Sequence, residues 1–404
     1  MGSLPCQNRQ SQENSLNDYR VYASFCPRDP APDVNMANWI ECYNPSNNSW
    51  HRTTTIPGPD DHVLKDFAMV PMGDSIYVIG GRLCHKMTGK EPGDGVVEVE
   101  LEVLSSVLRY NVHTDVWSKC APLGTARFNF ACTISDNKIY VAGGQAMLDS
   151  ARGISSAEVY DPGLDQWRPL PNMSTLRYKC VGVTWQGRIH VVGGFAEKED
   201  CDSQGPYMME RSSAEVYDTR AARWDLMARM WELDVPPNQI VAVGGKLYSS
   251  GDCLNTWKGH IEAYDAKLNI WNVVEGSYLH TLSSPISTSD AMEENWDRQY
   301  LTVAPIGTHL YFLAGYRMPG EISRLKSAVH VFDTSSNGDG WRSFEPMEEE
   351  GEKELCCHCC VLKQVPNHQA YEGSALDNSC SALQLSCMAS TSTNVIATMT
   401  MYGI

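Results

Sequence analysis

The chain has 404 residues and a formal net charge of −17 at neutral pH. This acidic surface would on average repel a phosphate backbone, which argues against general nucleic-acid binding. No apolar run approaches the ~20 residues of a membrane-spanning helix, and no secretory signal is visible. The 15 cysteines in a chain without an export signal are typical of reduced thiols, so we expect a cytoplasmic protein, with the nucleus as a second compartment.

Residues 1–18 form a short polar segment that can bury little apolar surface, and we expect this segment to be mobile. After it, an aromatic residue followed by a tryptophan recurs along the chain. Tyr43 precedes Trp50 by seven residues, and in the last copy Phe332 lies nine residues before Trp341. The spacing of seven recurs ahead of Trp117, Trp167, Trp224 and Trp271. Six copies in one chain indicate an internal repeat.

A short apolar strand lies ahead of each aromatic residue, and in three copies it ends on a glycine pair. We expect these glycines where a strand ends against a neighbouring sheet, because a side chain there would clash and the backbone needs positive φ. The pairs are Gly80 and Gly81, Gly143 and Gly144, and Gly193 and Gly194. Segments 21–25, 247–251 and 310–315 fit the same strand without the full pair.

A further strand precedes most copies of this unit. The sequence places it at 67–71, 128–134, 178–185, 239–243 and 301–304. The copy expected ahead of residue 21 is missing, whereas an apolar run at 355–362 follows the last tryptophan. We infer that this carboxy-terminal strand joins the amino-terminal sheet, so that six four-stranded units close into a ring.

Four strands per repeat are typical of a β-propeller, and the spacing of the copies is close to that of kelch repeats. The glycine pair, the tyrosine and the tryptophan together resemble the kelch family over residues 19–362. The resemblance implies an all-β, six-bladed kelch β-propeller. We expect its repeat aromatics to be structural, because each buries about 150–250 Å² between sheets. The Ser/Thr/Asn-rich tail, 363–404, has no kelch pattern, and we expect it to be disordered.

Insertions in a propeller of this kind gather on one face. The long loops are predicted at 82–106, 195–213, 253–260 and 316–327, and the segment 276–299 joins two repeats. Long loops on a rigid frame are a common place for binding residues. We therefore expect the loop-rich rim to recognise another molecule.

Three arginines recur at one place on that rim. Arg127, Arg177 and Arg298 each lie seventeen residues before the second glycine of their copy, where we expect them to point towards the mouth of the channel. Converging guanidinium groups favour an acidic peptide or another carboxylate. The alternative is that each arginine pairs with an acidic loop residue such as Glu197 or Asp200. The predicted partner-binding residues are Arg127, Arg177, Arg298, Trp257, Trp296, Tyr316 and Arg317.

If the rim arginines bind the partner, replacing both Arg127 and Arg177 by alanine should abolish binding and leave thermal unfolding nearly unchanged.

The run Cys356 to Cys360, with His358 at its centre, looks rich in metal ligands. Alternation along a strand would point Cys356, His358 and Cys360 to one side and the other two cysteines to the opposite side. We therefore predict no metal and no cofactor.

The phrase Ser156-Ala157-Glu158-Val159-Tyr160-Asp161 resembles plant kelch-repeat proteins, including those that carry an F-box. An F-box needs more residues than 1–18 provide. We therefore predict a monomeric scaffold or adaptor that binds another protein or an acidic ligand. The alternative is a propeller enzyme, a metal-free lyase or isomerase of specialised metabolism, in which the rim arginines work with His260 or His280 in acid/base chemistry. The sequence identifies no catalytic residue.

Overall fold

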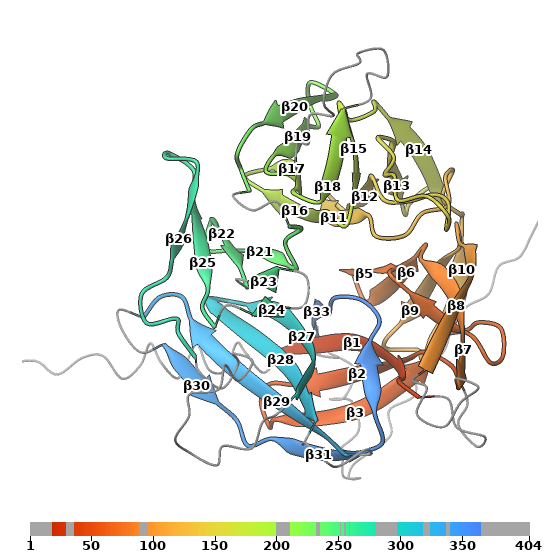
Figure 1. Cartoon of the computed structure of the whole chain (residues 1–404), viewed down its shortest axis with the longest axis vertical. Coiled ribbons are helices and arrows are strands. Elements are labelled where there is room, and N and C mark those ends of the chain that lie inside the picture. The colour runs from red at the N-terminus through yellow and green to blue at the C-terminus, as the bar shows by residue number, and fades with distance from the viewer. Residues whose placement is uncertain are drawn as a thin grey trace, which may run out of the picture. The chain divides into compact units, whose positions relative to one another are not determined.

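The structure is a computed structural model. It describes residues 18–29, 36–88, 96–198, 211–231, 235–250, 252–253, 256–257, 259–279, 297–317, 324–336 and 340–364. All of these residues belong to one compact unit, Met1–Gln364. They are organised in antiparallel sheets (Figure 1). No helix occurs among them, and hence none long and apolar enough to span a membrane.

Most strands belong to antiparallel sheets of four or five strands, and the sheets follow one another along the chain in the order of the repeats. The second sheet contains β5 (Ala68–Met72), β6 (Ser75–Ile79), β9 (Val107–Asn111) and β10 (Val116–Cys120). The third contains β11 (Ala131–Ser135), β12 (Lys138–Ala142), β13 (Ala157–Asp161) and β14 (Gln166–Leu170). The fourth contains β16 (Val181–Trp185), β17 (Arg188–Val192), β19 (Ala214–Asp218) and β20 (Arg223–Met227).

Two further sheets follow along the chain. One contains β21 (Ile240–Val243), β22 (Lys246–Ser249), β25 (Glu262–Asp265) and β26 (Ile270–Val273). The other contains β27 (Asp297–Ile306), β28 (His309–Arg317), β29 (Arg324–Asp333) and β30 (Trp341–Ser343), with β31 (Met347–Glu350) also paired to β29. Smaller sheets are formed by β4 (Val63–Lys65), β7 (Arg82–Thr88) and β8 (Val96–Val103), by β15 (Thr175–Tyr178) and β18 (Phe195–Lys198), and by β23 (Asp252–Cys253) and β24 (Thr256–Trp257).

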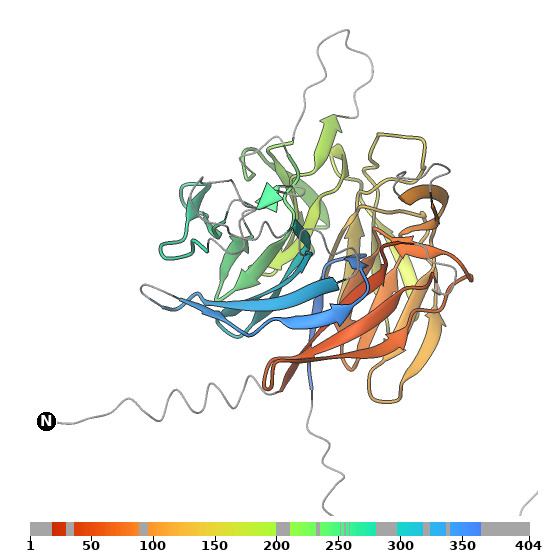
Figure 2. The same ribbon diagram turned by 60° about the horizontal axis from the view of Figure 1, so that its bottom comes forward.

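The first sheet combines strands from both ends of the described chain. It contains β1 (Tyr19–Pro27), β2 (Trp39–Asn44) and β3 (Ser49–Thr55), and β1 pairs with β32 (Lys353–Leu355) and β33 (Cys360–Lys363). Figures 1 and 2 show the red and blue strands side by side. One edge strand of each large sheet contacts an edge strand of the next. These strands are, in order, β5, β11, β16, β21, β27 and β33, and β33 contacts β5.

The predicted run 355–362 is two strands rather than one. β32 ends at Leu355 and β33 begins at Cys360, so the intervening residues 356–359 lie outside both strands. The expectation of strict alternation through Cys356, His358 and Cys360 is therefore wrong.

The repeat aromatics lie opposite each other within a sheet and reach the sheet before it. Tyr160 and Trp167 are register partners, with ring centroids 5.1 Å apart. The Trp167 indole N–H donates to the Ala121 carbonyl at 2.9 Å, directly after the preceding sheet. Trp224 and Trp271 donate in the same way to the carbonyls of Pro171 and Met230, and Trp117 donates to the Thr54 hydroxyl. These residues therefore hold neighbouring sheets together, and the spacing of seven reflects a tight turn between paired strands.

The glycine pairs lie where neighbouring sheets approach most closely. Gly143 has φ of 68°, a conformation that few residues with a side chain adopt. A Cβ at this position would lie 2.7 Å from the carbonyl oxygen of Arg177, which belongs to β15 of the next repeat. Steric crowding and backbone conformation thus both require glycine here.

Candidate functional site

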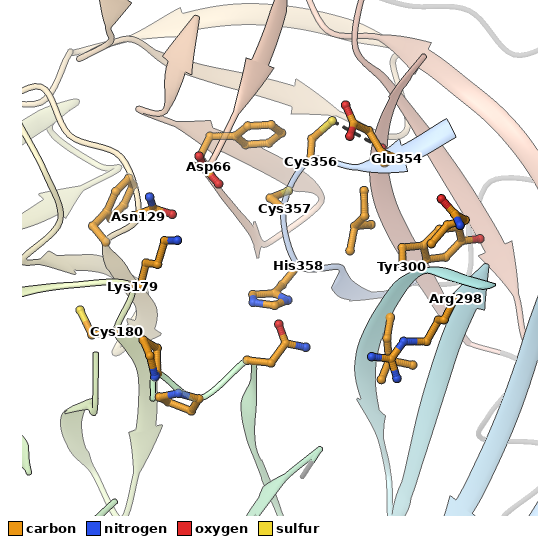
Figure 3. Close-up of a pocket in the computed structure, with 18 of the residues that line it drawn as sticks. Asp66, Asn129, Lys179, Cys180, Arg298, Tyr300, Glu354, Cys356, Cys357 and His358 are labelled. Atoms are coloured by element: carbon orange, nitrogen blue, oxygen red, sulfur yellow. Dashed lines mark hydrogen bonds between the residues drawn. The ribbon is translucent and has the colours of Figure 1, made fainter. Parts of the chain in front are cut away.

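A pocket of about 750 Å³ lies where the first strands of the sheets begin. We call it the inner-strand pocket. Short segments from many parts of the chain line it, as Figure 3 shows. Its lining residues are Arg28, Asp66, Phe67, Asn129, Phe130, Lys179, Cys180, Pro236, Pro237, Asn238, Arg298, Gln299, Tyr300, Leu301, Glu354, Leu355, Cys356, Cys357 and His358.

Three of these residues occupy the same position in successive repeats. Asp66, Asn129 and Lys179 each lie fifteen residues before the second glycine of their repeat and have φ of 54°, 54° and 53°. Their backbones are linked: the Asn129 N–H donates to the Asp66 carbonyl at 3.1 Å, and the Lys179 N–H donates to the Asn129 carbonyl at 2.7 Å. The Asp66 N–H donates in turn to the Cys356 carbonyl at 3.3 Å.

This left-handed conformation is common for Asn and Asp but unfavourable for lysine. A strained residue of this kind persists only where the surrounding structure holds it, and such residues gather at functional sites. The sequence analysis missed all three positions. The sequence does contain a signal for them. Asn129 and Lys179 lie two residues after Arg127 and Arg177, and Asp66 occupies the matching position of its repeat.

Lys179 differs from the other charged groups of the pocket. Its side chain is exposed and extends into the same space as His358 (Figure 3). Asp66 accepts a hydrogen bond from Arg82 at 2.6 Å, and Arg28 lies 3.6 Å from Glu352. Within the described part of the chain, the Lys179 ammonium group has no ion pair or side-chain hydrogen bond. The pocket thus offers one cation without a carboxylate of its own.

His358 is open to the pocket but surrounded by protein. Burial lowers the pKa of its imidazole to about 4, and a backbone contact with Asn238 opposes that shift. His358 is therefore neutral at physiological pH and contributes a hydrogen-bonding group rather than a charge.

Arg127 and Arg177 do not lie on the rim as free cations. Both side chains are completely buried (0% exposed). Arg127 donates to the carbonyl oxygens of Gly143 and Ser156, each at 2.9 Å, and to the Glu158 carboxylate at 2.7 Å. Burial lowers the pKa of Arg127, and Glu158 opposes this effect.

Arg177 repeats this arrangement in the next sheet. Its guanidinium donates to the carbonyl oxygens of Gly193 and Ser213, and its Nε lies 3.7 Å from Glu215. The predicted orientation of Arg127 and Arg177 towards solvent is therefore wrong, because the third strand of each sheet supplies acceptors that enclose the guanidinium. Among the described residues, the acidic partners are Glu158 and Glu215. The side chain of Glu197 and the whole of Asp200 lie outside the described part of the structure, so pairing with them stays a prediction.

The other predicted rim residues have different environments. Arg298 lies in β27, is partly buried and lines the inner-strand pocket. Arg317 lies 3.8 Å from Glu352, and Tyr316 is buried in a hydrophobic cluster. Trp257 lies in β24, with a side chain outside the described part of the structure, and Trp296 lies outside the described residues. Their contribution to partner binding stays a prediction.

The cysteine-rich segment meets the pocket through Cys356, Cys357 and His358. Burial raises the pKa of the Cys356, Cys357 and Cys360 thiols well above the ordinary range and that of Cys359 to about 12. Burial therefore favours the protonated thiols over the thiolates. Among the residues that the structure describes, no cluster of three or more metal-ligating side chains is found.

Comparison with known proteins supports the repeat assignment. Residues 126–174 match the Kelch motif. The chain is 32% identical over 202 residues to an F-box/kelch-repeat protein of Arabidopsis thaliana, covering 48% of this chain and 46% of that protein. A second Arabidopsis F-box/kelch-repeat protein, OR23, is 29% identical over 290 residues, covering 65% of this chain and 62% of OR23. Mouse Kelch-like protein 36 is 25% identical over 192 residues, covering 46% and 26%.

The chain thus spans less than two thirds of the length of each of these relatives. The matched kelch motif contains Tyr160 and Trp167, one of the six aromatic copies. The chain contains a kelch motif and is similar to kelch-repeat proteins of plants and animals, which confirms the resemblance drawn from the sequence.

Proposed function

We propose that residues 19–362 form a closed, six-bladed kelch propeller and that this propeller is a monomeric scaffold or adaptor. The pairing of β1 with β33 supports closure, because it joins strands from opposite ends of the propeller. The contacts that run from β5 through β33 and back to β5 also support it. Each first strand then delivers its preceding loop to the inner-strand pocket.

The bound partner is an acidic segment of another protein. The observation that carries this proposal is Lys179, which extends an ammonium group into the inner-strand pocket without an internal carboxylate partner. Arg298 lines the same pocket and adds positive charge, whereas Arg28 is paired with Glu352. A carboxylate that entered would form charge-assisted hydrogen bonds in a partly desolvated space. The acidic remainder of the surface would disfavour acidic ligands elsewhere.

The test compares Lys179→Gly with Asn129→Gly. Both replace a residue at positive φ by glycine, so the free energy of unfolding should change by no more than about 1 kcal/mol in either variant. Only Lys179→Gly removes a charge. Fluorescence anisotropy with a labelled glutamate-rich peptide should show about tenfold or more weaker binding for Lys179→Gly. Asn129→Gly removes a neutral side chain from the same pocket, so its effect on binding should be much smaller than that of Lys179→Gly.

Equal peptide binding by wild type and Lys179→Gly would contradict the proposal. Native mass spectrometry of the protein purified from its own host supplies the second readout. A co-purifying protein that Lys179→Gly loses and Asn129→Gly keeps would support the scaffold function. A retained small molecule would favour the propeller enzyme instead.

A further inference from the structure

The hairpin of β7 and β8 forms a separate small sheet with β4. Its register pairs Lys86 with Glu98, His85 with Val99 and Met87 with Val97. Opposed residues in an antiparallel pair project to the same face. One face therefore carries Arg82, Lys86 and Glu98, and the other carries Met87, Val97 and Val99.

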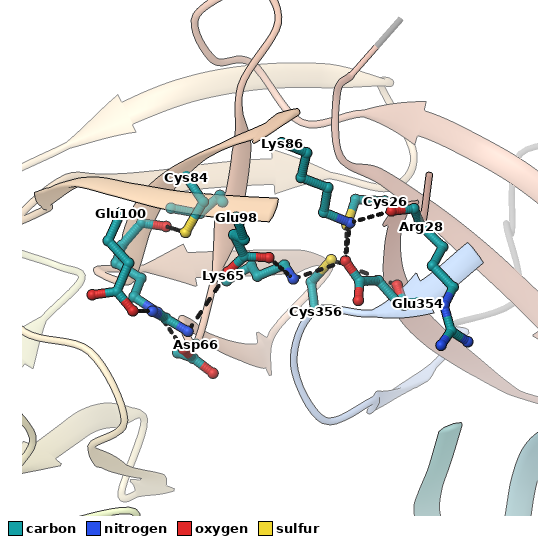
Figure 4. Close-up of polar contacts among 12 residues, drawn as sticks. Cys26, Arg28, Lys65, Asp66, Cys84, Lys86, Glu98, Glu100, Glu354 and Cys356 are labelled. Carbon is teal, nitrogen blue, oxygen red and sulfur yellow. Dashed lines mark hydrogen bonds and ion pairs between the residues drawn. The ribbon is translucent and has the colours of Figure 1, made fainter. Parts of the chain in front are cut away.

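The charged face lies towards the body of the protein. Lys86 is buried, pairs with Glu354 and donates to the Pro27 carbonyl at 2.6 Å. Lys65 pairs with Glu98 and lies 2.8 Å from Glu354 (Figure 4). Burial alone would raise the pKa of Glu354, but Lys65 and Lys86 outweigh this effect and lower it. Ion pairs thus attach the hairpin to the first sheet.

The apolar face is exposed. Met87 is 43% exposed, Val97 48% and Val99 38%. Leu101 is also exposed, but it lies at the register shift and has no partner in β7. A sheet with one solvated face normally turns its apolar side inward and its polar side outward. This hairpin does the reverse. Clustered exposed apolar side chains of this kind mark an interaction site.

β8 is also an edge strand. In the described residues it pairs with β7 alone, so its other side leaves backbone N–H and C=O groups unpaired by any strand. Natural proteins usually protect such an edge by a bulge, a proline, charged side chains or a covering loop. In β8 the register shift lies between Glu100 and Glu102, and the pairing of residues 96–100 with β7 is regular. An exposed edge beside an apolar face matches recognition by strand addition, in which backbone bonds supply affinity and alternate side chains supply specificity.

The charges along β8 select the occupant. Glu98, Glu100 and Glu102 alternate along the strand with apolar residues. Glu98 pairs with Lys65 and Glu100 with Arg82, whereas Glu102 has no ion pair within the described residues and is the carboxylate open to a basic partner. A second copy of this chain would place the same three carboxylates against them, and both copies would carry a net charge of −17. We propose that β8 binds an extended segment of a partner protein in which apolar and basic residues alternate. This surface is separate from the inner-strand pocket.

The test titrates the full chain with a fluorescent peptide of alternating valine and lysine, matched in length to the 8 residues of β8. We expect saturable binding, slower amide exchange in residues 96–103, and weaker binding at high salt. Replacing both Val97→Lys and Val99→Lys should weaken binding about tenfold or more. The matched control is Leu268→Lys, at a side chain that is 66% exposed on another sheet, and it should bind normally.

Failure of the peptide to bind would overturn the proposal. Equal binding of a valine–glutamate peptide would also overturn it, because the carboxylates would then select nothing. A wild-type dimer that the double lysine variant dissociates would assign the edge to a second copy instead. Lys179→Gly should leave this binding unchanged, so the result is independent of the pocket.

Discussion

The third and fourth sheets, β11 to β14 and β16 to β20, form a comparison within one chain. Both third strands read Ala-Glu-Val-Tyr-Asp, at Ala157–Asp161 and Ala214–Asp218. Each glutamate lies beside a buried arginine and accepts backbone N–H bonds from the loop before the first strand. The groups that satisfy buried polar atoms are therefore the same in both sheets.

Three of the positions at which the sheets differ change charge or hydrogen bonding. His190 replaces Tyr140 in the second strand, Ala222 replaces Asp165 in the outer turn, and Lys179 replaces Asn129 at the pocket. The backbone is nevertheless the same: Asp165 and Ala222 have φ of 49° and 51°, and Asn129 and Lys179 have 54° and 53°. The repeat thus dictates the backbone, while individual side chains set charge, pH response and binding.

The largest expected effect concerns the shared arginine. Arg127→Met and Arg177→Met should each lower the free energy of unfolding by about 3–5 kcal/mol, because each leaves a buried glutamate without its cation. Chemical denaturation measures the change. Lys138→Met is the control, because its ion pair with Asp161 is largely exposed and should contribute at most about 1 kcal/mol.

This expectation reverses the one drawn from sequence, in which removal of both arginines leaves unfolding nearly unchanged. An unchanged free energy of unfolding in both arginine variants would contradict this expectation. It would favour the prediction that these arginines lie on the rim and bind the partner.

The second prediction concerns the pH dependence of stability, to which the two sheets should contribute differently. Burial lowers the pKa of His190 to about 4, well below the ordinary value of about 6.5. Between these values the unfolded chain binds a proton that the folded protein excludes, so stability falls as the pH drops from about 6.5 to about 4. The contribution of His190 is on the order of 2–3 kcal/mol.

His190→Tyr, which copies the third sheet, should remove this part of the pH dependence. Denaturation at several pH values measures it, and the difference between wild type and variant cancels the effect of other histidines such as His330. Parallel stability curves for the two proteins would show that His190 does not titrate in this way.

The smallest effect concerns the outer turn. The Tyr160 hydroxyl donates to Asp165 at 2.7 Å, whereas Ala222 supplies no acceptor at the matching position beside Tyr217. Tyr160→Phe should therefore cost about 1–2 kcal/mol of unfolding free energy and Tyr217→Phe less than about 0.5 kcal/mol. Thermal unfolding of the two single variants tests the difference. Equal losses would mean that the ring packing, not the hydroxyl, decides both values.

Much of the sheet structure could be predicted because its signals are local. Tyr160 and Trp167 face each other across a tight turn, so their spacing follows from the hairpin that contains them. The glycine at 143 follows from a close approach that excludes a side chain. The candidate site was harder to predict. Arg177 and Lys179 are cations two residues apart, and the recurring spacing pointed to Arg177, which is buried, instead of Lys179, which is exposed.

The sequence by itself therefore determined the repeat, its strands and its glycine-bearing strand ends, since each depends on neighbours within one hairpin. Only the tertiary structure decided which charges are buried and which face the solvent. Arg177 is enclosed by Ser213 and Glu215 from a later strand. The apolar side of β8 faces outward because Glu354, from the far end of the chain, holds Lys65 and Lys86 on the inner side. Long-range pairing of charges, which no local pattern encodes, makes these choices.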